Sequence, residues 1–154
     1  MPKGLTSKAK LHIILTLSVM VFIFVQSALT GEVSGAESNV IVQFVSGLTG
    51  IPAESLGLFV RKAAHFTEFM ILGMCQTLNV KDRLQLKAAA LDFGRLWPAS
   101  WLIATAYAAT DEIHQLFVPE RACAFVDVCI DSCGAALGAF VAGLVLLRRK
   151  NKES

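Results

Sequence analysis

Four long apolar runs, separated by polar segments, set the pattern of this chain. They cover residues 11–29, 59–78, 96–117 and 125–147. About 20 apolar residues in a helix suffice to cross the hydrocarbon core of a bilayer, so each run predicts one transmembrane helix. The pattern therefore predicts an all-α membrane protein, in which residues 1–154 form a single domain built as a bundle of four transmembrane helices.

Lys and Arg residues gather in alternate connecting segments and give this bundle an orientation. The connection 30–58 contains neither residue type, whereas basic residues flank the runs at Lys3, Lys8, Lys10, Lys81, Arg83, Lys87, Arg95, Arg148, Arg149, Lys150 and Lys152. Because cytoplasmic loops carry the excess of Lys and Arg, we expect both termini to be cytoplasmic. The chain is then a multi-pass protein of the cytoplasmic membrane.

Composition agrees with this interpretation and excludes one class of function. Hydrophobic residues make up 55% of the chain and charged residues 17%, while the formal net charge is only +2. The orientation already accounts for the basic residues, so nothing in the sequence indicates binding to nucleic acid.

The first apolar run has an alternative interpretation as a cleaved signal peptide. A signal peptide also has a basic start, an apolar stretch and small residues near its end, as this run has around Ser27 and Ala28. The apolar part of a signal peptide is about 7 to 15 residues long. The run at 11–29 is longer, which favours a helix that stays in the protein.

Two polar clusters interrupt the apolar pattern. The first comprises Arg61, Lys62, His65 and Glu68, and the second comprises Asp111, Glu112, His114, Gln115, Arg121, Asp127 and Asp131. In hydrocarbon such side chains are costly unless they are paired or turned to water, so a cluster of them is a candidate functional site. With the expected orientation, both clusters lie in one layer near the outer leaflet, and we expect them to meet.

Helical spacing arranges the clusters in stripes, because residues three or four apart share a face of a helix. The stripes are Arg61, His65, Glu68 and Leu72; Tyr107, Asp111 and His114; and Asp127, Asp131, Gly134 and Gly138. Gly134 and Gly138 form a small-xxx-small pattern, which lets transmembrane helices approach closely. We therefore expect the face with Asp127 and Asp131 to point at other helices.

Aromatic residues of the third run have simpler interpretations. Trp97 and Trp101 stand at its cytoplasmic start, which is typical of an aromatic belt at a membrane surface. Tyr107 lies one turn before Asp111. Its hydroxyl can join the polar cluster, or its ring can pack in the core.

Two stretches hold most of the polar residues in a fixed order. They read RKAAHFTEFMILG at 61–73 and DEIHQLFVPERACAFVDVCIDSCGAALG at 111–138. Together they resemble the VanZ-like family of bacterial membrane proteins, named for a protein associated with resistance to the glycopeptide antibiotic teicoplanin. The chain departs from the family pattern at Glu120, where the family usually has the glycine of Pro-Gly-Arg. The resemblance implies a multi-pass protein of the bacterial inner membrane with a link to the cell envelope or the glycopeptide response.

The first functional hypothesis is a binding site for an anionic head group. Its candidate residues are Arg61, Lys62, Gln115, Arg121, Asp127 and Asp131. Guanidinium and ammonium groups provide charge-assisted donors for phosphate or carboxylate, and the acids would keep the donors in place. The expected partners are membrane lipids, or a lipid-linked cell-wall precursor in the outer leaflet.

The second hypothesis is catalysis on a lipid-linked substrate. A histidine would act as acid or base and carboxylates would orient it; the candidate residues are His65, Glu68, Asp111 and Glu112. No metal-binding signature of known spacing is present. We expect neither a metal nor another cofactor.

The third hypothesis is structural, since ion pairs between helices are a usual way to satisfy charges within a membrane. Arg61 would pair with Asp127 or Glu112, and Arg121 with Asp131. The small-residue faces leave room for a homo-oligomer. A proton-coupled carrier would use the same acids and histidines, but the small number of helices and the lack of a charge path into the cytoplasmic half weigh against it.

Overall fold

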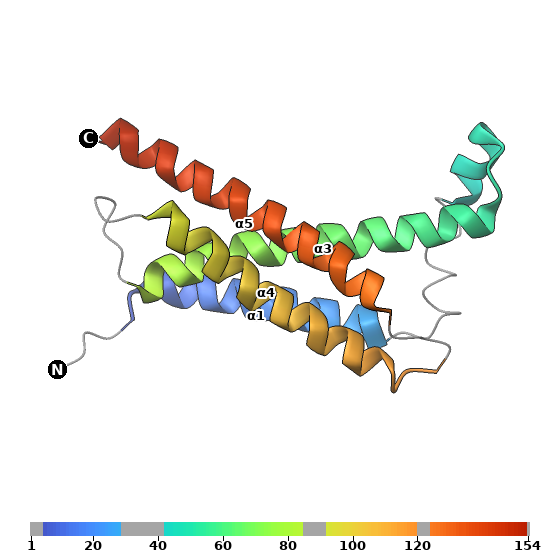
Figure 1. Ribbon diagram of the computed structural model, residues 1–154, viewed down its shortest axis with the longest axis horizontal. Coiled ribbons are helices and arrows are strands. Elements are labelled where there is room, and N and C mark those ends of the chain that lie inside the picture. Colours follow the sequence, from blue (N-terminus) through green and yellow to red (C-terminus); the bar gives the residue numbers. More distant parts are fainter. Residues whose placement is uncertain (1–4, 29–41, 85–91, 120–123, 154) are drawn as a thin grey trace.

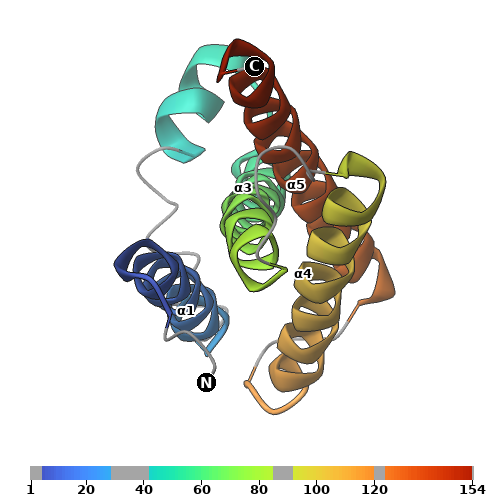
Figure 2. The ribbon, with the colours of Figure 1, turned by 90° about the vertical axis from the view of Figure 1, so that its left-hand side faces the viewer.

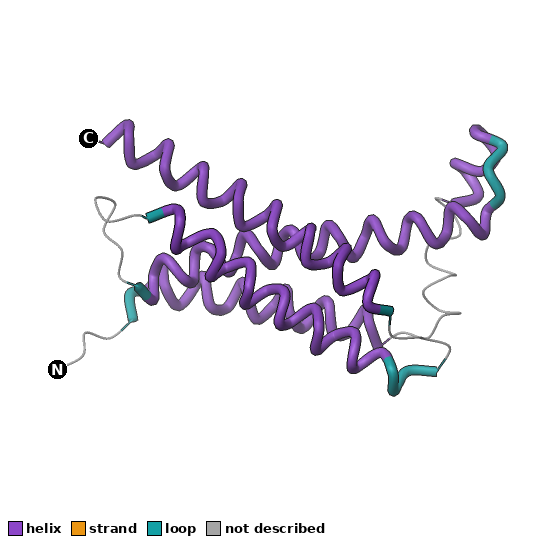
Figure 3. The backbone as a smooth tube through the Cα atoms, in the orientation of Figure 1, coloured by secondary structure: helices purple, strands orange, loops and turns teal. Residues whose placement is uncertain are grey.

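The protein is a bundle of long helices in a computed structural model that describes residues 5–28, 42–84, 92–119 and 124–153. The long helices are α1 (Ser7–Ala28), α3 (Ala53–Arg83), α4 (Phe93–Gln115) and α5 (Phe125–Glu153). A short helix at 42–49 precedes α3, and the described residues contain no strand (Figure 3). The predicted all-helical architecture is confirmed.

The long helices run alternately in opposite directions (Figure 1). The start of α1 and the end of α5 therefore lie at the same end of the bundle. We call the opposite end, where α1 and α4 finish and α3 and α5 begin, the site end. Seen along the bundle, α3 lies in the middle and packs against α1, α4 and α5 (Figure 2).

Only part of the predicted membrane topology is supported. Two helical segments among the described residues are long and apolar enough to cross a membrane, Ser7–Ala28 and Phe125–Arg149. The helices α3 and α4 do not meet this criterion, so the four-span bundle stays a prediction. The helix α4 begins at Phe93, before the apolar run at 96–117, and Pro98 lies inside it. The Asp92 side chain caps this start by accepting a hydrogen bond from the Gly94 N–H at 3.0 Å.

Backbone contact between α3 and α5 holds the centre of the bundle. A side-chain carbon added to Gly134 would overlap the carbonyl oxygen of Phe66, and one added to Gly138 would overlap that of Met70. Gly73 of α3 lies equally close to the backbone of Ala135. Small residues permit this approach of two helices. The prediction that Gly134 and Gly138 face another helix is confirmed.

Two indole rings join α4 to α5. The Trp97 Nε1–H donates to the carbonyl oxygen of Ala136 at 3.0 Å, and the Trp101 Nε1–H donates to Ser132 Oγ at 2.9 Å. The two rings stack with centroids 5.7 Å apart. Both polar N–H groups therefore find partners on a neighbouring helix, while the position of the two rings at a membrane surface stays a prediction.

Hydrogen bonds fix α1 to the bundle along its length. The Tyr107 hydroxyl donates to the carbonyl oxygen of Met20 at 2.7 Å. Far from the site end, His12 Nδ1 and Asp82 Oδ2 lie 2.6 Å apart, and the Asn79 amide donates to Thr16 Oγ1. These contacts favour an α1 that belongs to the bundle over a cleaved signal peptide. They also show that polar contacts are not confined to the single layer expected from the sequence.

Replacing Gly138 by alanine tests the α3–α5 contact. We expect Gly138→Ala to lower the free energy of unfolding by about 1–3 kcal/mol or more, because the new methyl group forces two backbones apart. Thermal unfolding of the detergent-extracted protein measures the change. Gly57→Ala is the matched control, since a carbon added there meets nothing within 4 Å. A Gly138→Ala variant as stable as the wild type would contradict the packing.

Candidate functional site

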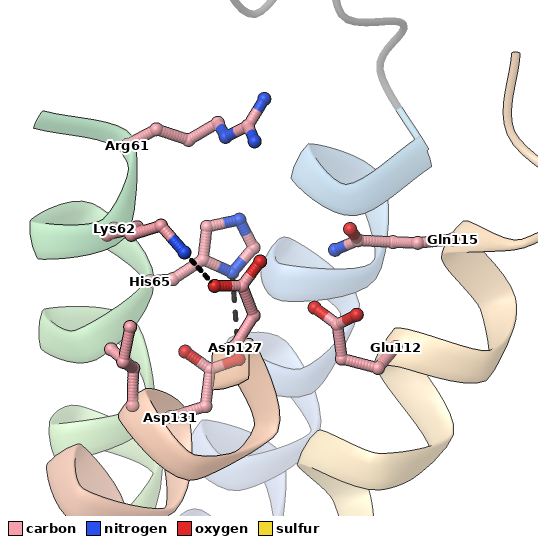
Figure 4. Close-up of a pocket in the computed structure, with 8 residues that line it drawn as sticks. Arg61, Lys62, His65, Glu112, Gln115, Asp127 and Asp131 are labelled. Carbon is pink, nitrogen blue, oxygen red and sulfur yellow. Dashed lines mark hydrogen bonds and ion pairs between the residues drawn. The ribbon is translucent and has the colours of Figure 1, made fainter. Parts of the chain in front are cut away.

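A polar pocket opens at the site end between three helices (Figure 4). Its lining combines cations, acids, an amide and one apolar side chain: Arg61, Lys62 and His65 from α3, Glu112 and Gln115 from α4, and Asp127, Ile130 and Asp131 from α5. About 20 Å³ of the pocket is open to a water-sized group, which is room for about one water molecule. Seven of the predicted site residues thus lie in one place.

The two cations of the pocket have different surroundings. Lys62 Nζ forms an ion pair with Asp127 Oδ1 (Figure 4). Arg61 is half-buried and has neither a hydrogen bond nor an ion pair with any residue in the described ranges. The structural hypothesis had paired Arg61 with Asp127 or Glu112. The structure differs because Asp127, in the first turn of α5, is taken by the neighbouring lysine.

His65 and Asp131 face each other across α3 and α5. His65 Nδ1 lies 3.9 Å from Asp131 Oδ2, which is an ion-pair distance but too long for a hydrogen bond. Asp131 is only 1% exposed. Within the described part of the chain, neither of its carboxylate oxygens has a hydrogen-bond partner.

Glu112 and Gln115 close the α4 side of the pocket. Glu112 is 2% exposed, and its Oε2 accepts a hydrogen bond from the Ala124 N–H at 3.0 Å. This bond ties the end of α4 to the residue that precedes α5. The Gln115 amide donates to Ser27 Oγ and to Asp111 Oδ2 at 3.5 Å each, so it links the pocket to α1.

Two candidate catalytic residues lie outside the pocket, on the α1 side of the bundle. Asp111 is buried, and its Oδ2 accepts a hydrogen bond from Ser27 Oγ at 2.6 Å. Glu68 lines a groove between α1 and α3 beside Phe22 and Ile71. Of the predicted site residues, Arg121 lies outside the described residues. Glu68 and Asp111 therefore do not line the pocket that contains His65 and Glu112.

Ser27 is a buried polar residue that sequence reasoning missed as part of the site. It is fully buried and donates to the carboxylate of Asp111. Next to this contact the ring of His114 lies against Phe24, with centroids 4.3 Å apart. A serine in an apolar helix gives little signal by itself, although serines are enriched where transmembrane helices meet.

The arrangement of the described site residues can be compared with the one that a metal ion requires. Among residues 5–28, 42–84, 92–119 and 124–153, no group of three His, Cys, Asp or Glu side chains is arranged to hold a metal ion. The pocket instead places three carboxyl groups next to two permanent cations and one histidine. Such a set can bind charged groups or transfer protons.

Comparison with known proteins supports the resemblance seen in the sequence. A family model described as VanZ/LLP1 matches residues 12–147, which include every described residue of the pocket. No curated protein matches the chain, and no solved structure matches it.

Replacing Ser27 by alanine tests its contact with Asp111. We expect Ser27→Ala to reduce the free energy of unfolding by about 1.5–3 kcal/mol, because hydrogen bonds to a charged group contribute about that much. Thermal unfolding in detergent measures the loss. Ser18→Ala, at an exposed position of the same helix, should change little. Equal stability of the two variants would count against the contact.

Proposed function

Because the chain belongs to the VanZ/LLP1 family, we propose that it is a multi-pass protein of the bacterial inner membrane that binds an anionic head group. The ligand is a membrane lipid or a lipid-linked precursor of the cell envelope. Through such a ligand the protein would act in the cell envelope and in the response to glycopeptide antibiotics. The proposal rests on Arg61, which lines the pocket without an ion-pair partner among the described residues.

The Arg61 guanidinium is suited to an anion that comes from outside the protein. It lines the pocket, half-buried, without an ion-pair partner among the described side chains. A guanidinium has five N–H donors in a fixed fork that matches phosphate or carboxylate. An anionic ligand at the pocket would give these donors a charged partner.

The order of charges along α3 favours binding at the mouth of the pocket. Arg61 lies one turn, about 6 Å, nearer the start of α3 than His65, and Figure 4 shows it above the carboxylates. Lys62 already neutralises Asp127. An anion next to Arg61 is therefore separated from the most deeply buried acid, Asp131.

Replacing Arg61 by alanine tests the head-group site. We expect native mass spectrometry of the protein extracted from phosphatidylglycerol vesicles to show bound phosphatidylglycerol in the wild type. Arg61→Ala should bind at least about tenfold less, since hydrogen bonds to charged groups contribute about 1.5–3 kcal/mol. Arg83→Ala, an exposed arginine at the other end of α3, serves as the control. Equal amounts of lipid on all three proteins would refute the proposal.

A second candidate function is catalysis on a lipid phosphate, favoured by the contact of His65 with Asp131. A carboxylate beside one ring nitrogen can orient a histidine so that the other nitrogen transfers a proton or attacks. The two groups lie 3.9 Å apart, and Glu112 lines the same pocket as a second acid. Under this candidate Asp131, rather than Glu68, orients His65.

Phosphate release from lipids in vesicles distinguishes catalysis from binding. With phosphatidic acid or an isoprenyl diphosphate as substrate, we expect the wild type to release inorganic phosphate and His65→Gln to lose at least about 100-fold in rate. His12→Gln, a histidine far from the pocket, is the control. A wild type that releases no phosphate, while Arg61 still governs lipid binding, leaves binding as the function.

A further inference from the structure

The deep side of the pocket holds a carboxylate to which no described residue donates a hydrogen bond. Asp131 is 1% exposed, and among the described residues neither of its oxygens has a hydrogen-bond donor. His65 Nδ1 lies 3.9 Å from Asp131 Oδ2, which is too long for a hydrogen bond. A buried charge is costly unless it is paired and hydrogen-bonded. Asp131 therefore indicates a donor supplied by a ligand.

The free space of the pocket limits what this donor can be. About 20 Å³ is open to a water-sized group, which corresponds to about one water molecule. A primary ammonium group has about this size and carries three N–H donors with a positive charge. The described residues contain no group of three side chains that could hold a metal ion. The pocket chemistry thus favours an organic cation.

We propose that the pocket binds a primary ammonium group at Asp131 and Glu112 together with a phosphate at Arg61. This inference rests on the proposed head-group site and specifies its ligand class as a phosphate ester that carries a primary amine, as in ethanolamine phosphate. The two charged groups are separated by about one helical turn, or ~6 Å, along α3. A short carbon chain between phosphate and amine spans this separation.

This ligand class predicts selectivity between lipids that share a phosphate. Phosphatidylethanolamine satisfies both Arg61 and Asp131. Phosphatidylglycerol satisfies only the arginine, because its head group has no cation. Phosphatidylcholine has a quaternary ammonium group, which has no N–H donor and is larger than the single water-sized space of the pocket. We expect the order of binding to be phosphatidylethanolamine, phosphatidylglycerol, phosphatidylcholine.

The test is a competition between the three lipids, with bound lipid counted by native mass spectrometry of the full chain. The wild type should prefer phosphatidylethanolamine over phosphatidylcholine by at least about tenfold. Asp131→Asn keeps the shape of the side chain and should lose this preference. It should still bind phosphatidylglycerol through Arg61, which shows that the variant is folded. Glu54→Gln removes the same charge at an exposed position of α3 and should behave like the wild type.

Each contrary outcome points to a different failure. An Asp131→Asn variant that keeps the preference for phosphatidylethanolamine overturns the ammonium site. A wild type that binds phosphatidylglycerol as well as phosphatidylethanolamine, with both released by Arg61→Ala, overturns the ammonium site but keeps the anion site. If Arg61→Ala releases neither lipid, both proposals fall. Soluble glycerophosphoethanolamine at millimolar concentration should not displace the lipid, and displacement would overturn a membrane source of the ligand.

Discussion

Close contact between the backbones of α3 and α5 positions the polar pocket. Gly134 rests on the carbonyl group of Phe66, and His65 directly precedes that residue. Asp131 lies one turn before Gly134, so the same contact brings its carboxylate to the histidine ring. Protein interiors are close-packed and transmit small shifts. A wider separation of the helices would therefore change the geometry of the pocket as well as the stability of the bundle.

Some polar side chains of the interior form hydrogen bonds or ion pairs that stabilise the fold. Others have no hydrogen bond with the described residues. Ser27 donates a hydrogen bond to Asp111 next to the pocket, and Lys62 pairs with Asp127 at its edge. Arg61 and Asp131 make no such hydrogen bonds with the described residues. Natural proteins break the rules of polar burial mainly at functional sites. The contrast within one pocket is therefore the strongest structural argument for a ligand.

Sequence periodicity predicted much of this arrangement, because it reports which residues share one helix face. It placed Asp131 on the face of Gly134 and Gly138, as observed. Because Glu68 and His65 belong to one stripe, periodicity could not show that only His65 lines the pocket. The helix α5 crosses α3 at Phe66. Residues on one face of α3 therefore have different neighbours on the two sides of this crossing, and periodicity does not give the position of the crossing. Periodicity likewise could not show that the lysine, rather than the arginine before it, reaches Asp127.

The attachment of α1 has a mechanical consequence. Ser27 joins this helix to α4 near the site end, while His12 joins it to α3 near the other end. A helix held near both ends can bend, but it cannot move away from its neighbours as a rigid body. The two contacts therefore restrain α1 on both sides of the groove between α1 and α3 that Phe22 and Glu68 line.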